Sequence, residues 1–485
     1  MPPLKALCLL LTTSAALAVS TPVLADDLRE ALVAAYNTNP TLQGARATQR
    51  ATDEGVPLAR ARALPSLSGQ ANYTRFLRQN PLSFVLLDSS KSVDVSLGIP
   101  VYSGGAVKNA IRAAKTRVEA GQEDLRATES GVFAQVVAAY MDVIRDSAIV
   151  GLSRNNVEVL DVNFKATGDR YEIGDLTRTD VAQSDSRLAL ARGDLRNAEV
   201  NLIASRERYI QIVGKAPVDL APPPPLPGLP ATPDEAVNFA LENNPDLLAA
   251  RERSKAAGYD VKIAGAAKLP TVSLSSQGSY QDTAGTLAGA GGGSFKQRAT
   301  TAQAGVSVSI PLFQGGAPAA QTRQAQARES ATLEQEIAVE REVIASVRSS
   351  YASWSAANEI IAMNQTAVDA AALSLEGVRA ENTVGNRTIL NILDAEQELL
   401  RAQVQLVTAR RNAYVAGFNL LAAMGRAQAQ DLGLDGGALY DPQTNYDRVR
   451  RRMFDWDRDP DPKPVSTRTV DTPAQNATIT PTQLP

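Results

Sequence analysis

The residue types most often used in catalysis and metal binding are nearly absent from this chain. Its 485 residues include no histidine and a single cysteine, Cys8. Histidine general bases, Ser-His-Asp triads and histidine-containing metal sites are therefore excluded. The sequence also lacks a GxxxxGK[ST] phosphate loop and a GxSxG nucleophile motif. We predict that the protein is not an enzyme and has no catalytic residues, cofactor or metal site.

One acidic run resembles a calcium-binding loop but lacks two of its required residues. Aspartates alternate from Asp455 to Asp461, with Pro460 in the sixth position of the loop and Ser466 in the twelfth. An EF-hand needs glycine and glutamate at these positions, so this site is excluded. The 49 basic and 52 acidic side chains give a net charge of -3. This balance predicts no nucleic-acid partner.

The two ends of the chain differ from the rest. Residues 1–25 read as a signal peptide, because Lys5 precedes an apolar run that ends in the small-residue site Val23-Leu24-Ala25. No later stretch reaches the ~18 consecutive apolar residues of a membrane-spanning helix. Residues 430–485 are rich in Asp, Pro, Thr and Arg without periodicity, which predicts a polar C-terminal tail that is disordered or lies along the protein surface.

The sequence between these ends consists of two copies of one unit. Asn39-Pro40 recurs as Asn244-Pro245, and later landmarks such as Pro100 recur 211 residues further on, as Pro311. Self-similarity at a fixed offset indicates a repeated structure. We therefore divide the chain into a first repeat (residues 26–220), a proline-rich linker (residues 221–232) and a second repeat (residues 233–429).

Each repeat is expected to contain a long helical hairpin. Residues 101–216 and 319–441 contain no proline, as unbroken helices require. Gly174 and Gly385 interrupt these stretches and mark the turns. At 1.5 Å per residue, the first helix of a hairpin spans about 95–100 Å, and we expect two shorter helices stacked end to end to match it. Heptad spacing favours coiled-coil packing; its seam is Val136, Val143, Val150, Val157 and Phe164.

Each repeat also contains a pair of predicted strands, at about residues 66–102 and 271–312. Apolar and polar residues alternate within them, most strictly from Val93 to Val101. Strands of about ten residues with this alternation are typical of outer-membrane barrels, although a small soluble sheet has the same pattern. Export and the absence of disulfides favour the membrane. A membrane sheet has no free edge and the smallest barrel has about eight strands, so we predict that three chains contribute twelve strands.

These features together resemble the TolC family of outer-membrane channels. The resemblance lies in the repeat, in the segments Pro100–Gly105 and Pro311–Gly316, and in Val384–Asp394, and it covers about residues 27–428. It implies a mainly α-helical homotrimer in the outer membrane of a Gram-negative bacterium. A 12-stranded β-barrel, with four strands per chain, lies in the lipid and continues as a long periplasmic α-helical barrel.

The resemblance further implies an exit duct gated at its periplasmic tip. It would contact outer-membrane lipid, a periplasmic adaptor (membrane fusion) protein and an inner-membrane ABC or RND-type transporter. Type I protein secretion and small-molecule efflux both fit. In the family pattern the pore constriction falls on Asp394 and Asn391. The gating links fall on Arg387, Asp180, Thr179 and Asn382, and the hairpin tips for adaptor docking on Gly174, Asp175, Gly385 and Asn386.

The main alternative is a structural or adhesive coiled-coil protein of the cell envelope. It would share the heptads but would not need paired strands at equivalent places in both repeats. A periplasmic adaptor would show one helical hairpin between β-rich halves, whereas this sequence has two. The paired strands therefore favour the duct.

Overall fold

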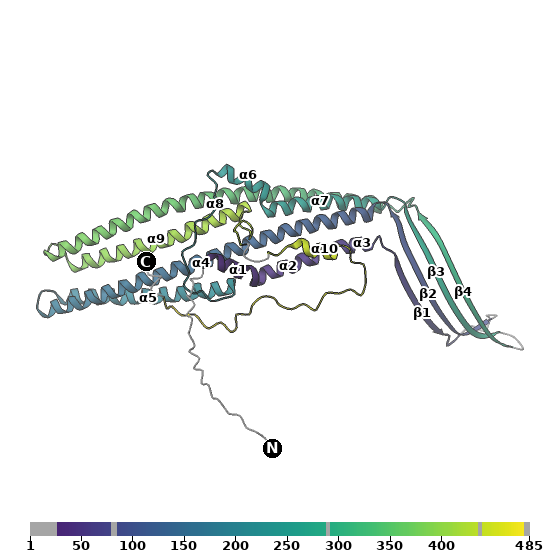
Figure 1. Cartoon of the computed structure of the whole chain (residues 1–485), viewed down its shortest axis with the longest axis horizontal. Coiled ribbons are helices and arrows are strands. Elements are labelled where there is room, and N and C mark those ends of the chain that lie inside the picture. Colours follow the sequence, from purple (N-terminus) through teal and green to yellow (C-terminus); the bar gives the residue numbers. More distant parts are fainter. Residues whose placement is uncertain (1–26, 79–84, 288–291, 435–438, 480–485) are drawn as a thin grey trace, which may run out of the picture.

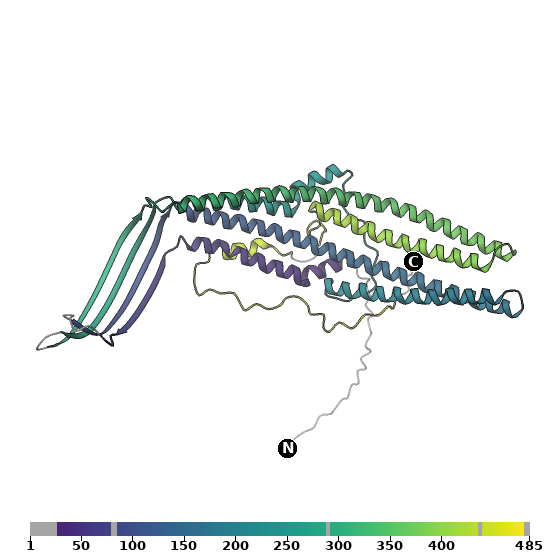
Figure 2. The same cartoon turned by 180° about the vertical axis from the view of Figure 1, so that it is seen from behind.

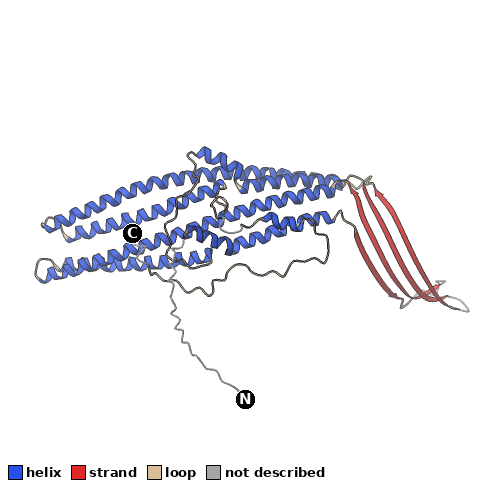
Figure 3. Ribbon diagram, viewed as in Figure 1, coloured by secondary structure: helices blue, strands red, loops and turns tan. Residues whose placement is uncertain are grey.

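A computed structural model describes residues 27–78, 85–287, 292–434 and 439–479. The predicted signal peptide lies outside this part of the chain. Helices occupy most of an elongated molecule, and four strands extend from one end of it (Figure 3). The predicted fold class, mainly α with four strands per chain, is confirmed. None of the helices in the described ranges is both long and apolar enough to span a membrane.

Two long helices set the length of the molecule. Helices α4 (Ala106–Glu172) and α8 (Ala317–Thr383) have 67 residues each, about 100 Å at 1.5 Å per residue. The returning helices α5 (Arg178–Val213) and α9 (Ile389–Met424) have 36 residues each. They cover about half of that length and run beside the long helices from the hairpin tips back to the middle of the molecule (Figure 1).

Shorter helices stack end to end on α5 and α9, and each stack forms a column beside a long helix. Helix α7 (Pro245–Ala266) continues the line of α9, whereas α2 (Pro40–Asp53) and α3 (Gly55–Ala61) continue that of α5. The sequence pattern predicts one helix over about residues 41–63, and this prediction is wrong, because the structure divides it into α2 and α3. Pro57 lacks the N–H that would bond one turn back, so the helix is interrupted at Glu54. The outer helices α1 (Leu28–Thr38) and α6 (Pro233–Asn243) precede these columns in the two repeats.

A buried asparagine joins the helices of each stack. The side-chain oxygen of Asn39 accepts a hydrogen bond from the N–H of Leu42 (3.3 Å), and its amide donates to the Ile212 carbonyl (2.9 Å). Asn244 caps α7 in the same way and donates to the Ala423 carbonyl (2.8 Å). Each asparagine therefore satisfies both an orphan donor at one helix start and an orphan acceptor at the other helix end.

The four strands form one antiparallel sheet in the order β1-β2-β3-β4. They are β1 (Ser66–Arg75), β2 (Val85–Ser103), β3 (Thr271–Leu287) and β4 (Ser294–Ser309). Strands β2 and β3 pair across the two repeats, so β1 and β4 each have one edge without a partner within the described chain. Three strands exceed the predicted ten residues, because polar residues such as Ser90 and Thr283 extend the ladder beyond the alternating segments.

The C-terminal segment has more structure than predicted. Helix α10 (Pro442–Val449) packs on the first repeat and buries Tyr446 and Val449. The Asn445 amide donates to the Asp53 carboxylate (2.6 Å). Further along, Arg206 donates to two backbone carbonyls of the tail, 2.5 and 2.8 Å away. Of the two expected states, this part of the tail lies along the protein surface. Helix α10 itself is not predicted, because one short helix is too brief to give a periodic signal.

The hydrophobic core lies midway along the molecule. Its largest buried side chains are aromatic, and they come from α4, α5 and α9: Phe133, Tyr140, Tyr209 and Phe418. Tyr140 donates to the carbonyl of Ala221 in the linker (2.6 Å), and its repeat equivalent Tyr351 donates to that of Ala231 (2.7 Å). The linker is thereby fixed at both ends by equivalent tyrosines.

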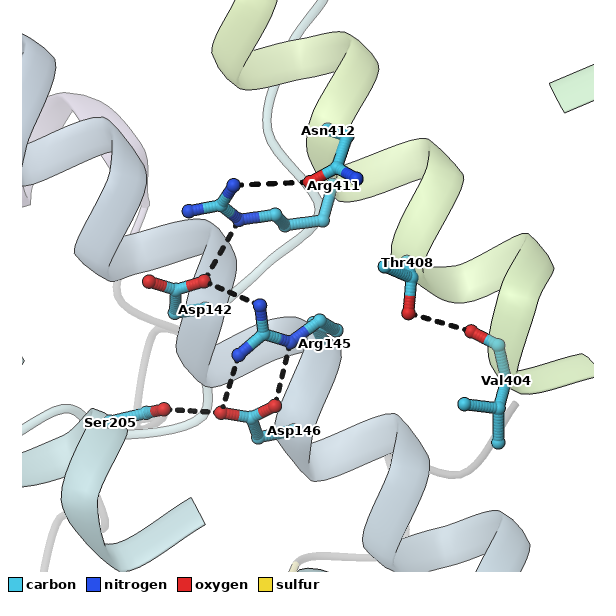
Figure 4. A network of polar contacts seen from close by, with 8 residues as sticks. All are labelled: Asp142, Arg145, Asp146, Ser205, Val404, Thr408, Arg411 and Asn412. Atoms are coloured by element: carbon cyan, nitrogen blue, oxygen red, sulfur yellow. Dashed lines mark hydrogen bonds and ion pairs between the residues drawn. The ribbon is translucent and has the colours of Figure 1, made fainter. Parts of the chain in front are cut away.

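A polar network ties α4 to both returning helices (Figure 4). Arg411 of α9 donates to Asp142 of α4 (2.8 Å), which also pairs with Arg145 (2.9 Å). Arg145 forms two bonds to Asp146 (2.7 and 3.0 Å), whose carboxylate also accepts a bond from Ser205 of α5. The hydrogen bonds to Asp146 raise the pKa of Arg145.

Loss of Arg145 should destabilise this junction. Asp146 is only 4% exposed, and leaving a buried charge without its partner costs about 1–3 kcal/mol or more. We expect Arg145→Ala to lower the melting temperature of the detergent-solubilised protein, measured by circular dichroism, by several degrees. The control Arg196→Ala removes a pair from the α5 surface and should change it little. Equal effects of both variants would contradict the assigned role.

Candidate gate at the hairpin ends

The two helical hairpins end in the same turn. Gly174 and Gly385 follow the long helices with φ of 84° and 82°, the left-handed region that favours glycine. The N–H groups of Asp175 and Asn386 then donate to carbonyls one turn back (2.9 and 3.0 Å). All four predicted tip residues are exposed. Within one chain the tip of the α4–α5 hairpin and the tip of the α8–α9 hairpin lie apart from each other (Figure 2).

Two predicted gate residues form capping boxes at the starts of α5 and α9. The Asp180 carboxylate accepts bonds from the N–H and hydroxyl of Thr177 (2.9 and 2.7 Å), which lower its pKa. Asn391 lies at the equivalent position and accepts the same pair of bonds from Thr388 (3.1 and 2.9 Å). These two side chains therefore cap the N-terminal ends of α5 and α9. Thr179 is exposed beside Asp180.

The predicted Arg387–Asp180 contact is not formed within one chain. Arg387 pairs instead with Glu381 of its own hairpin (2.6 Å). Asn382 also stays within this turn, because its amide donates to the Arg387 carbonyl (2.7 Å). Within one chain, each of these groups therefore bonds inside its own turn and stabilises the tip.

Asp394 is the predicted residue that does connect the two hairpins. Its carboxylate on α9 lies 2.6 Å from the guanidinium of Arg187 on α5. Arg187 also donates to the side chain of Gln397 (2.6 Å), one turn further along α9. The Asp394 side chain remains 55% exposed, so its carboxylate is accessible while it is paired.

A buried glutamate lies beside this contact. Glu396 accepts two hydrogen bonds from the Asn163 amide of α4 (both 3.1 Å) and pairs with Arg379 of α8 (3.0 Å). Its side chain is 5% exposed. Glu396 thus joins three long segments, and replacement would leave the Asn163 donor without its acceptor.

An apolar cluster surrounds these polar contacts. It contains side chains from α4, α5 and α9, and its buried members are Leu160, Leu188, Ala191 and Leu393. Exposed ion pairs are screened by salt, whereas this cluster carries no charge, so it provides a part of the hairpin contact that does not weaken by screening.

Neither Arg187 nor Glu396 was predicted from the sequence. Their partners are 207 and 233 residues away, and no spacing rule connects residues so distant. A local signal existed only for the capping boxes, in the Thr-x-x-Asp and Thr-x-x-Asn patterns that begin at Thr177 and Thr388.

Removing Glu396 should loosen the contact between the hairpins. We expect Glu396→Ala to lower the free energy of unfolding by about 1–3 kcal/mol, because a buried donor loses its charged acceptor. The control Glu381→Ala breaks an exposed pair with Arg387 and should change it by about 0–1 kcal/mol. The measurement is chemical unfolding followed by circular dichroism. A smaller effect for Glu396→Ala than for the control would contradict this account.

The chain is similar over most of its length to known outer-membrane proteins. The chain is 35% identical to the outer membrane efflux protein BepC of Brucella suis over 433 residues, 89% of this chain and 92% of that protein. It is 26% identical to the outer membrane protein TolC of Escherichia coli, over 88% of this chain and 87% of that one. The structure of the Campylobacter jejuni CmeC outer membrane channel superposes with a TM-score of 0.72 at 15% identity, covering 87% of this chain and 89% of that one.

A family model described as outer membrane efflux protein matches residues 31–215 and 236–426. These two segments correspond to the two repeats, with the linker between them. The predicted resemblance and the outer-membrane location in a Gram-negative bacterium are confirmed. The chain belongs to the outer membrane efflux protein family.

Proposed function

We propose that three copies of this chain form an outer-membrane exit duct that is gated where the helical hairpins end. The observation that carries the proposal is a four-stranded sheet, at the end of helices about 100 Å long, whose two edges have no partner among the described residues of the chain. In lipid, every backbone donor and acceptor needs a partner. Edge β1 of one copy would pair with edge β4 of the next, and twelve strands would close the ring.

The duct would work with an inner-membrane transporter and a periplasmic adaptor. We infer that the adaptor docks at the hairpin tips, where equivalent apolar residues Ile173 and Val384 are 80% and 70% exposed. Small-molecule efflux is the favoured cargo class, because the relative with 35% identity is named as an efflux protein. No described contact favours the alternative of an adhesive coiled-coil protein.

The gate would depend on Asp394 and Arg187. In a ring of three copies, three Asp394 carboxylates would converge, attract cations and repel one another. Arg187 would hold each carboxylate and keep the two hairpins of a copy together. One partly exposed pair contributes about 0–1 kcal/mol, so the apolar cluster and Glu396 would supply the rest of the closure. Arg387 and Asp180 are left out of this gate, since both are bound within their own turns.

Single-channel recording in planar bilayers tests the duct and its gate. We expect the wild-type protein to form channels and Arg187→Ser to raise the mean conductance or open probability by up to about fivefold, the factor for 1 kcal/mol. Asp394→Ala should weaken block by divalent cations. The matched control is Arg196→Ser on the exposed face of the same helix.

The two parts of the proposal fail in different ways. Absence of channels for every variant would contradict the duct and favour a structural envelope protein. Wild-type channels with unchanged conductance in Arg187→Ser and unchanged block in Asp394→Ala would leave the duct intact and contradict this gate.

A further inference from the structure

The segment that follows α10 forms a loop that protrudes from the helices of the chain. We call residues 451–466 the arch. At its start, Arg60 of α3 donates to the Arg450 carbonyl (2.7 Å). Beyond its end, Thr467 lies against Gly214 at the end of α5, and Gln475 donates its N–H to Glu207 (3.0 Å). Between these anchors the arch runs outside the α2 and α5 edge of the helical layer (Figures 1 and 2).

The arch exposes large apolar side chains. Trp456 is 97% exposed, Phe454 79% and Met453 60% near its start, and Val465 is 71% exposed near its end. Scattered exposed apolar residues are ordinary, but a contiguous group indicates an interaction surface. Trp and Phe are also residue types enriched in the centres of protein interfaces.

The arch is held in one shape before it binds anything. Arg452 pairs with Asp457 (3.2 Å) and Asp459 (3.1 Å), and Arg448 pairs with Asp459 through two bonds (2.6 and 2.8 Å). These pairs neutralise carboxylates at the base of the arch. The sequence Asp-Pro-Asp-Pro-Lys-Pro from Asp459 to Pro464 then favours a stiff, extended backbone. Such an arch loses little conformational freedom on docking.

Helix α8 provides the complementary surface at the opposite edge of the layer. Only five of its 67 residues are buried, whereas 23 of the 67 residues of α4 are buried. It contacts α6, α7 and α9 of its own chain, and it carries the partly exposed residues Leu333 (49%) and Ile337 (45%), one turn apart.

The arch and this part of α8 lie at the same level along the molecule. Tyr446, just before the arch, packs on Val118 of α4, whose equivalent in the second repeat is residue 329 of α8. Copies related by rotation about the long axis keep this level. We propose that the arch seats on α8 of a neighbouring copy, with Phe454 and Trp456 packed on Leu333 and Ile337.

Lipid is a less favoured partner than a neighbouring copy for the apolar side chains of the arch. The aspartates at 455, 457, 459 and 461 are separated by Trp456, Arg458 and Pro460, and burying such charges in a bilayer is costly. At a seam between two proteins the same carboxylates stay at the solvated rim. The inference rests on the proposed three-copy assembly and adds a clasp that crosses its outer surface.

Photo-crosslinking distinguishes these occupants. The probe p-benzoyl-phenylalanine replaces Trp456 in a tagged chain that is coexpressed with a differently tagged wild-type chain, and the trimer is illuminated in outer-membrane vesicles. We expect a covalent product that carries both tags, with the crosslink mapped by mass spectrometry to residues 317–350 of the other chain. The probe at Leu333 should react reciprocally with residues 451–466.

The control places the probe at Thr469, beside Thr467 and α5 of its own chain, and should give crosslinks within one chain. Products at position 456 that lie within one chain, that contain lipid, or that fail to form would each overturn the inference. Light scattering of the purified complex reports the number of copies separately. Three copies with no arch crosslink would contradict only the clasp, whereas a single copy would contradict the proposed assembly.

Discussion

The stacking of short helices on one another is the constraint on which the rest of the structure depends. A helix end leaves four backbone groups without partners, so two ends can meet in a protein interior only if something satisfies them. Asn39 and Asn244 do this with one side chain each, accepting from the helix that begins and donating to the helix that ends. Both are buried, at 7% and 5% exposure, and each is followed by a proline that favours a helix start.

The stacked columns make the helical layer uniform in length. A short pair then matches a single long helix, so four columns run side by side and deliver four strands at one end (Figure 3). The same constraint leaves α8 and the α2–α5 column at opposite edges with few buried residues on α8. Open edges in the sheet and in the helical layer therefore occur together. A ring of identical copies satisfies both at once, which is the physical reason for the proposed assembly.

The sequence predicted those features that have local or periodic signals. Proline-free stretches, the glycines Gly174 and Gly385, and the strict alternation around Val93 depend on neighbouring residues, and the repeat doubles each signal. The features that the sequence did not predict depend on residues far apart in the chain, on a single proline, or on an element too short to show a period. Pro57 divides a helix that its neighbours would continue, α10 is too short for a periodic pattern, and the Arg187–Asp394 pair joins residues 207 apart. Asp180 and Asn391 were assigned to the gate, yet their capping role follows from the threonine three residues earlier.

The central claim is that both edges of the four-stranded sheet pair with copies of the same chain. Amide hydrogen exchange of the protein in lipid nanodiscs, read by mass spectrometry for peptides from β1 and β4, tests this most directly. The account predicts that the edge strands exchange as slowly as β2 and β3, because every backbone N–H donates to a neighbouring strand. Exchange of about half the β1 and β4 amides at the rate of an unpaired edge would contradict it.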